Sequence, residues 1–190
     1  LLLATLECYQ QAVAKAGAET AVAHALATAY YDIRAGLGYH KSPAVYGAFP
    51  TDPYSHTPMG SGASQPGMTG QVKEEILTRL GEMGVTFREE AICFTPTLLQ
   101  PDECLPEAAE FSYVDVHGEK QTVSLPPNSL AFTLCQTPIV YSRGESAQIM
   151  VIMANGRISG FPGHCLPRAI SQQIFQRDGQ VRQVQVTVPI

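Results

Sequence analysis

The sequence contains no tryptophan, and charged residues make up only 15% of its 190 residues. Its 12 lysines and arginines are scattered and form no basic run, which argues against nucleic acid as the main partner. No apolar run reaches the ~18 residues of a membrane-spanning helix, so we expect no membrane partner. The formal net charge of -5 favours neutral or cationic ligands over polyanions.

Motifs of nucleotide and metal chemistry are also missing. The chain has no P-loop, no GxGxxG and no GxSxG, and Gly60–Ser64 reads as a flexible turn. No cysteine or histidine spacing matches a metal site, so we expect neither a metal nor another cofactor. The five cysteines read as buried free thiols. A Cys93–Cys104 disulfide stays open as an alternative, and so does the cellular compartment.

Three helices are predicted before residue 84. Apolar residues recur at helical spacing over Leu1–Lys15 and again over Glu19–Arg34, and a short glycine link between them predicts an αα-hairpin. Gly70–Met83 reads as the third helix. The chain begins within a helical pattern, without an initiator methionine or the features of a signal peptide. We therefore expect it to continue a longer chain, whose missing N-terminal part is then a partner.

A long loop is predicted over residues 40–69. It holds five prolines, which block the interiors of helices and strands: Pro43, Pro50, Pro53, Pro58 and Pro66. A loop of this length in a compact domain is either functional or disordered. Charge is sparse and aromatic residues are frequent, which favours an ordered loop held by its aromatic side chains.

From Val85 the pattern changes to short strands. Phe111–Val116 with Gln121–Leu125, and Gln148–Ala154 with Arg157–Phe161, read as hairpins, and Asn-Gly between the second pair suits positive φ at both turn positions. We also predict a last hairpin, with strands at 170–176 and 181–188. Helices before strands predict an α+β protein, with a helical part over 1–88 and an antiparallel β-sandwich over 89–190.

The loop supplies the first candidate site. The loop carries in order Tyr46, Asp52, Tyr54 and His56, so hydrogen-bonding groups alternate with aromatic rings. Sugars stack their apolar faces on rings while their hydroxyls need donors and acceptors. We predict Asp52 and His56 as catalytic residues and the two tyrosines as substrate-binding residues. The alternative is structural: Asp52 forms a turn before proline and the tyrosines anchor the loop.

The helix that follows adds a candidate carboxylate. Glycoside hydrolysis uses two carboxylates across the scissile bond. Glu74 and Glu75 diverge by ~100° on a helix, so at most one of them acts on a given substrate. We predict Glu74 as that catalytic residue, with Gln65 and Gln71 binding hydroxyls. The alternative is that Glu75 pairs with Arg79 and Glu74 is solvated.

Certain stretches of the sequence resemble a known superfamily. YGAFPTDPYSHTP, QPGMTGQVKEEILTRLGE and LPPNSLAFTLCQTPIVY, with the predicted helices and final strands, resemble the C-terminal end of a large bacterial six-hairpin glycosidase-like protein. The resemblance implies an (α/α)6 toroid with its active site in loops at one end and a β-sandwich beside it. Members include glycoside hydrolases, glycan phosphorylases and polysaccharide lyases. No catalytic motif of the superfamily maps onto this chain residue by residue.

The resulting hypothesis is the C-terminal part of a carbohydrate-active enzyme that acts on glycosidic bonds of an oligo- or polysaccharide. One alternative is a non-catalytic β-sandwich module, either carbohydrate-binding or structural. Another is a polysaccharide lyase, which uses a tyrosine or histidine base, so that Tyr54 and His56 would matter more than Glu74.

Overall fold

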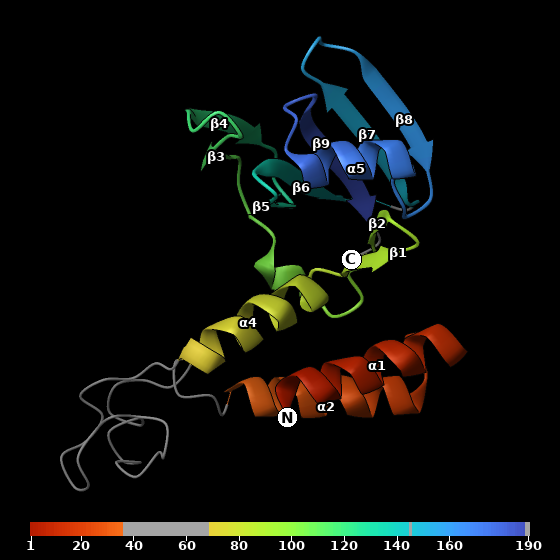
Figure 1. Cartoon of the computed structure of the whole chain (residues 1–190). Helices are drawn as coiled ribbons and strands as arrows, with labels where there is room; N and C mark the ends of the chain where they lie inside the picture. The colour runs from red at the N-terminus through yellow and green to blue at the C-terminus, as the bar shows by residue number, and fades with distance from the viewer. Residues whose placement is uncertain (36–68, 145, 189–190) are drawn as a thin grey trace, which may run out of the picture. The chain divides into compact units, whose positions relative to one another are not determined.

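The computed structural model describes residues 1–35, 69–144 and 146–188, and the side chains of all of these except 69–75. Within these ranges the chain forms four α-helices and nine β-strands, so the protein is of the mixed α+β class, as predicted (Figure 1). None of the described helices is both long and apolar enough to cross a membrane.

The chain divides into a helical unit, Leu1–Gly81, and a β unit, Glu82–Ile190, whereas the sequence placed the boundary between residues 88 and 89. The helical unit contains α1 (Leu2–Ala16), α2 (Ala21–Ala35) and most of α4 (Thr69–Glu82). These bounds agree closely with the three helices that apolar periodicity predicted.

Helices α1 and α2 pack against each other along their apolar faces. Leu2, Leu6 and Tyr9 of α1 are buried, as their spacing predicted. On α2 the buried residues are Ala23 and Tyr30, whereas the apolar Val22 is 62% exposed. Ala23 and Tyr30 are two helical turns apart, so they lie on the same face of α2.

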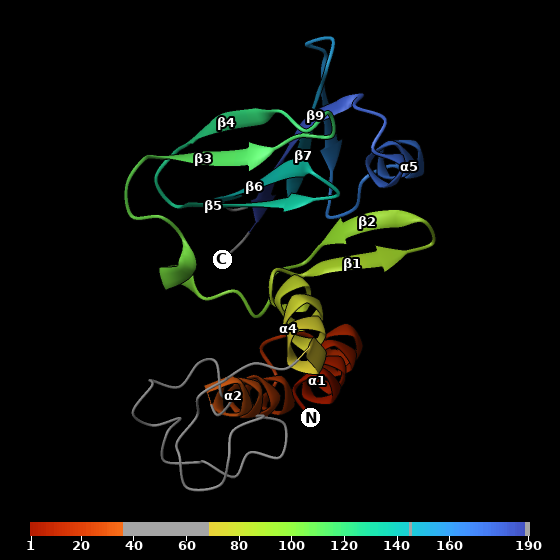
Figure 2. The same ribbon diagram turned by 60° about the vertical axis from the view of Figure 1, so that its left-hand side comes forward.

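The β unit starts with two separate hairpins and continues into one larger sheet (Figure 2). The hairpin strands are β1 (Val85–Arg88), β2 (Ala91–Phe94), β3 (Ala109–Val114) and β4 (Lys120–Leu125). The five strands of the sheet, in the order β5-β6-β9-β7-β8, are β5 (Ser129–Leu134), β6 (Thr137–Arg143), β7 (Gln148–Met153), β8 (Ile158–Pro162) and β9 (Val181–Val188). β6 and β9 run parallel. The expected all-antiparallel arrangement is therefore wrong for this sheet, because α5 (Arg168–Gln176) returns the chain for a parallel pairing.

One face of the five-stranded sheet is the core of the β unit. Ile139, Val184 and Val151 lie side by side across three strands, and each has no exposed surface. Tyr141 lies on the same face and contacts Phe94 of β2 edge to face, with ring centroids 6.0 Å apart. Its hydroxyl donates to the carbonyl oxygen of Met83 at 2.6 Å. Burying this hydroxyl without a partner would cost free energy. The bond to Met83 therefore favours the observed packing of β1 and β2 on the sheet.

Residues 170–176 form helix α5 rather than the strand that was predicted. Ser171 and Ile174 are three positions apart and are its buried residues, which is helical spacing. The Ser171 hydroxyl accepts the Ile92 N–H at 3.0 Å and donates to the Pro167 carbonyl oxygen, so α5 is joined to β2. The β-branched isoleucines of this segment favour a strand locally, but its packing on β2 stabilises a helix.

A disulfide links β2 to the segment before α5. It joins Cys93 and Cys165, so neither the free-thiol reading of these two cysteines nor the Cys93–Cys104 alternative is correct. The thiols of Cys8, Cys104 and Cys135 are free. The same segment pairs with β2 through the Phe94 N–H to His164 carbonyl bond and the Leu166 N–H to Ile92 carbonyl bond. The partner of Cys93 was missed because this pairing lies outside any regular strand.

The hairpin turns differ from the expectation in one detail. At Asn155-Gly156 only Gly156 has a positive φ, of 83°, while the Asn155 side chain accepts the Arg157 N–H at 3.0 Å. Positive φ at both turn positions occurs instead at Glu89-Glu90 and at Cys135-Gln136. These two-residue turns match the twist of the strands they join, so the strand pairing imposes a conformation that their residues do not favour alone.

Candidate functional site

Most of the site residues predicted from the sequence lie outside the described residues. These are Asp52, His56, Tyr46, Tyr54 and Gln65. Glu74 and Gln71 belong to helix α4, but their side chains are also outside the described part. The grouping of these residues into one site therefore stays a prediction.

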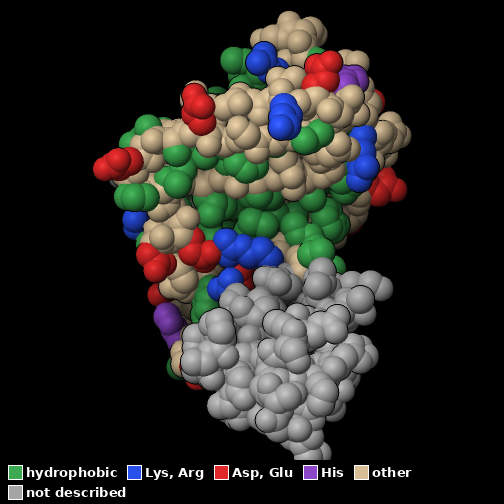
Figure 3. Space-filling model, turned by 90° about the vertical axis from the view of Figure 1, so that its left-hand side faces the viewer, with side chains coloured by type: hydrophobic (Ala, Val, Ile, Leu, Met, Phe, Trp, Pro, Cys, Tyr) green, Lys and Arg blue, Asp and Glu red, His purple; other side chains and the backbone are tan. Residues whose placement is uncertain are grey.

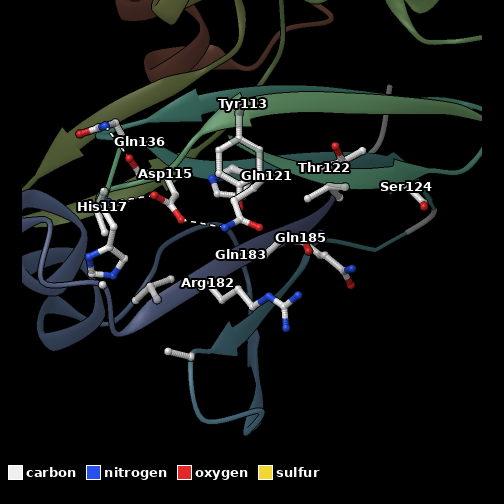
Figure 4. A pocket seen from close by; sticks show the side chains of 16 residues that line it. Tyr113, Asp115, His117, Gln121, Thr122, Ser124, Gln136, Arg182, Gln183 and Gln185 are labelled. Atoms are coloured by element: carbon white, nitrogen blue, oxygen red, sulfur yellow. Dashed lines mark hydrogen bonds between the residues drawn. The ribbon is translucent and has the colours of Figure 1, made fainter. Parts of the chain in front are cut away.

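The β unit contains a pocket that the sequence did not predict. It has a volume of about 560 Å³ and lies between the β3–β4 hairpin and strand β9 of the sheet (Figure 4). We call it the hairpin pocket. Its polar lining residues are Tyr113, Asp115, His117, Gln121, Thr122, Ser124, Gln136, Arg182, Gln183 and Gln185. Such a volume is within the ~300–1,000 Å³ of small-ligand sites, but the lining is far more polar than is usual.

The hairpin wall of the pocket is built by strand alternation. Side chains at every second position of β3 and β4 are half-buried, and those between them are exposed. Tyr113 and Gln121 are direct cross-strand partners on the half-buried face. The Tyr113 ring is held by Phe111, which stacks with it at 6.0 Å between centroids and an interplanar angle of 11°. The pocket thus has an aromatic ring beside an amide.

Asp115 organises the end of this hairpin. Its Oδ1 accepts the N–H groups of His117 at 2.9 Å and Glu119 at 3.0 Å, and its Oδ2 accepts the Gln121 amide at 3.0 Å. The Glu119 N–H, with the Gln121 amide and the His117 N–H, lowers the pKa of Asp115 below its ordinary value. The carboxylate therefore stays ionised at neutral pH and acts as an acceptor in the fold rather than as a proton donor.

The Asp115 carboxylate also orients Gln121. An ionised carboxylate only accepts hydrogen bonds, so the Gln121 Nε2 must face it and the Gln121 Oε1 must point the other way. Figure 4 shows the amide in this orientation, beside the Tyr113 ring. The pocket consequently presents a fixed acceptor oxygen at this position.

A second glutamine joins the hairpin to the sheet. Gln136, in the β5–β6 turn, donates from Nε2 to the Asp115 carbonyl oxygen at 2.8 Å. On the other side the His117 ring lies against Gly179, just before β9. These contacts hold the turn of the β3–β4 hairpin over the sheet, so the pocket has walls on two sides.

Strand β9 forms the opposite wall. Gln183 and Gln185 line the pocket, while the intervening Val184 points into the core and has no exposed surface. An amide offers one acceptor and two donors in a single plane, so the two side chains suit groups that both donate and accept. The sequence pattern that could have indicated this wall is the alternation of valine with glutamine, rather than with charged residues, along one strand.

The hydroxyl of Tyr113 completes the set of polar groups. Burial raises the pKa of Tyr113, and so does the nearby Asp115 carboxylate, while Arg182 opposes them. The hydroxyl therefore stays protonated at neutral pH and is available as donor and acceptor. Together with the glutamine amides, this hydroxyl allows the pocket to bind a ligand through neutral hydrogen-bonding groups.

Three other kinds of site are not supported within the described residues. No group of three or more histidine, cysteine, aspartate or glutamate residues there could hold a metal ion. On the face that Figure 3 shows, acidic and basic side chains of the described residues are interspersed and form no continuous basic surface. Cys165 is in a disulfide and so does not serve as a thiol nucleophile beside His164.

Comparison with known proteins does not assign the chain to a family. No family model matches the sequence, and no curated protein is significantly similar to it.

Proposed function

We propose that this chain is part of a carbohydrate-active protein and that its β unit binds an oligo- or polysaccharide in the hairpin pocket. The observation that carries the proposal is the convergence of an oriented aromatic ring and four glutamine amides on one pocket of about 560 Å³. A sugar presents an apolar face of C–H groups and a rim of hydroxyls that each donate and accept. Tyr113 suits the face, and the amides suit the rim.

Other ligand classes fit the pocket less well. Apolar ligands favour pockets lined mainly by hydrophobic side chains, whereas ten of the residues lining this pocket are polar. Nucleotide phosphates are held by glycine-rich loops at helix N-termini or by several basic groups. The pocket is lined by one arginine, and its histidine is its only other basic residue. A polyhydroxylated ligand therefore agrees best with the lining.

The finer architecture implied by the resemblance is part of the proposal. Leu1, Val22, Ile76 and Leu77 of the helical unit are between 53% and 84% exposed. This is unfavourable for an isolated unit and supports continuation into an (α/α) toroid, with the missing N-terminal part of the same chain covering these side chains. In the β unit, the half-buried face of the β3–β4 hairpin toward the sheet supports a two-layer sandwich.

A tyrosine substitution tests the binding proposal. In the full chain, Tyr113→Ala is expected to weaken saccharide binding at least tenfold, about 1.4 kcal/mol, because it removes both the stacking surface and a hydroxyl. The measurement is isothermal titration with the best ligand from an immobilised panel of oligosaccharides. The matched control is Val114→Ala, which changes a neighbouring side chain that is 47% exposed and does not line the pocket.

Two results would argue against this assignment. Equal losses of affinity in the Tyr113 and Val114 variants would move the binding site away from the hairpin pocket. Absence of binding to every oligosaccharide in the panel would reject the saccharide-binding function and favour a structural role for the β unit.

The second proposed function is catalysis at a glycosidic bond, and it depends on the predicted loop site. Asp52 and Glu74 would be the carboxylates of a hydrolase, with Tyr46, Gln65 and Gln71 binding the substrate. In the lyase alternative a Tyr54 or His56 base would abstract a proton. The hairpin pocket supports such an enzyme as an additional site that binds the polymeric substrate.

The loop site is tested on the full-length parent protein. Replacing Asp52 and His56 together by alanine is expected to abolish cleavage, with folding unchanged by circular dichroism. Reducing ends would identify a hydrolase, dependence on phosphate a phosphorylase, and unsaturated products a lyase. Activity equal to that of the unaltered protein would make the loop a structural element.

A further inference from the structure

A β-bulge brings an arginine into the hairpin pocket. In the pairing of β7 with β9, Ile152 faces Gln183 and Met153 faces Val181, so Arg182 has no partner on β7. Strict alternation would place Arg182 on the same face as the buried Val184. The extra residue instead lets Arg182 and Gln183, which are consecutive, both line the pocket. Bulges commonly re-aim a side chain next to a functional site.

Within residues 1–35, 69–144 and 146–188, the guanidinium of Arg182 holds no other element of the fold in place. No hydrogen bond or ion pair joins it to any other side chain in the described part of the chain. Arg168, by contrast, is paired with Glu89 at 3.2 Å. Figure 4 shows the Arg182 side chain extending from β9 on the pocket side, with Gln185 beyond it. Its five N–H donors are therefore available to a ligand.

The nearest acidic group in the pocket does not serve as a partner for Arg182. Both oxygens of the Asp115 carboxylate already accept hydrogen bonds, from His117 and Glu119 on one oxygen and from Gln121 on the other. Arg182 and Asp115 both act on the Tyr113 hydroxyl. The pocket therefore offers a ligand the Arg182 guanidinium, the Tyr113 hydroxyl and the glutamine amides. The Asp115 carboxylate is held by hydrogen bonds within the β3–β4 hairpin.

We propose that the saccharide bound in the hairpin pocket is an acidic one, and that Arg182 binds the carboxylate of a uronic acid residue in it. This inference rests on the saccharide-binding function proposed above. Two parallel N–H donors of a guanidinium match the two oxygens of a carboxylate. Gln185 and the Gln121 Oε1 then bind ring hydroxyls, and Tyr113 stacks on the sugar ring.

The charge of the molecule limits how acidic the ligand is. The chain has a formal net charge of -5, which repels a densely charged polyanion at long range. A single carboxylate at Arg182 gains a local, bidentate contact that this repulsion does not cancel. The structure therefore points to a glycan in which uronic acid residues alternate with neutral sugars rather than to a heavily sulfated one.

The experiment compares matched ligands on the full chain. Titrations use tetrasaccharides in which galacturonic, glucuronic or mannuronic acid alternates with a neutral sugar, the same oligomers after reduction of each carboxyl group to the neutral sugar, and sulfated forms of the neutral oligomers. The proteins are the unaltered chain, Arg182→Gln, Arg182→Lys and the control Arg88→Gln, which removes an exposed arginine that does not line the pocket.

One uronate series is expected to bind the unaltered chain at least tenfold more tightly than its carboxyl-reduced counterpart. Arg182→Gln should remove this preference and leave the affinity for the neutral oligomer unchanged. Arg182→Lys should keep only part of the preference, and Arg88→Gln all of it. Equal affinity for neutral and acidic oligomers would overturn the inference while the saccharide-binding function stands. Tighter binding of the sulfated oligomers would overturn the carboxylate assignment, and no binding in any series would overturn both proposals.

Discussion

Breaking the Cys93–Cys165 disulfide is expected to lower the free energy of unfolding of the β unit by roughly 4 kcal/mol. The two cysteines are 72 positions apart. A cross-link over a loop of this length removes much of the conformational entropy of the unfolded chain. For a unit of this size the loss corresponds to a fall in the melting temperature of about 15 °C.

The measurement is thermal unfolding with and without reductant, on the unaltered chain and on Cys165→Ala. Reductant should lower the melting temperature of the unaltered chain to that of the variant and leave the variant itself unchanged. Cys104→Ser is the control, since that thiol is free. Alkylation of the unreduced, denatured protein should label three of the five cysteines. Labelling of all five would disprove the disulfide.

The disulfide also bears on the compartment in which the protein folds and resides. Structural disulfides form and persist in oxidising compartments and are rare where thiols are kept reduced. The sequence alone left the compartment open because the cysteine count is odd and no spacing identified a pair. The disulfide of the β unit therefore favours an oxidising environment.

Replacing Gly84 with alanine is expected to destabilise the β unit by about 3 kcal/mol. Gly84 has a φ of 68°, in the left-handed region that costs other residues about 1–2 kcal/mol. A methyl group there would also meet the backbone carbonyl of Thr95 and the nitrogen of Pro96. The Gly84 carbonyl accepts the Thr95 N–H at 2.8 Å, so the two segments cannot separate without losing that bond. Overpacking of this kind adds roughly 1–3 kcal/mol.

Gly156→Ala separates the two contributions. Gly156 has a φ of 83°, but among the described residues, its two chain neighbours aside, no heavy atom lies within 4 Å of the position that its methyl group would occupy. This variant should be destabilised only by the cost of the left-handed backbone conformation, about 1–2 kcal/mol. Urea unfolding, monitored by circular dichroism, measures the free energy of unfolding of both variants. Equal destabilisation of the two variants would contradict the close contact between Gly84 and the Thr95–Pro96 backbone.

The regular elements were predictable because their signals are local. Apolar spacing in the first 35 residues identified helices α1 and α2, and alternation with turn residues identified the β3–β4 and β7–β8 hairpins. α5 was the failure: its isoleucines favour a strand locally, and the bond from Ile92 to Ser171 exists only once α5 has packed on β2.

The candidate site was not predictable to the same degree. The sequence directed attention to the loop over 40–69, where polar and aromatic residues are close along the chain. The hairpin pocket combines Tyr113 and Gln121 of the β3–β4 hairpin with Arg182 of β9, a strand far away in sequence. Which face each side chain occupies depends on strand order and on the bulge at Arg182, and neither leaves a local pattern.

By itself the sequence determined the α+β class, the order of helices before strands and the apolar alternation that builds the core, because each depends on residues within a few positions of one another. Only the tertiary structure decided that β9 lies between β6 and β7, that Cys93 pairs with Cys165 and that Asp115 orients Gln121. These features depend on which distant segments meet, and that is set by the packing of the whole β unit rather than by any single stretch.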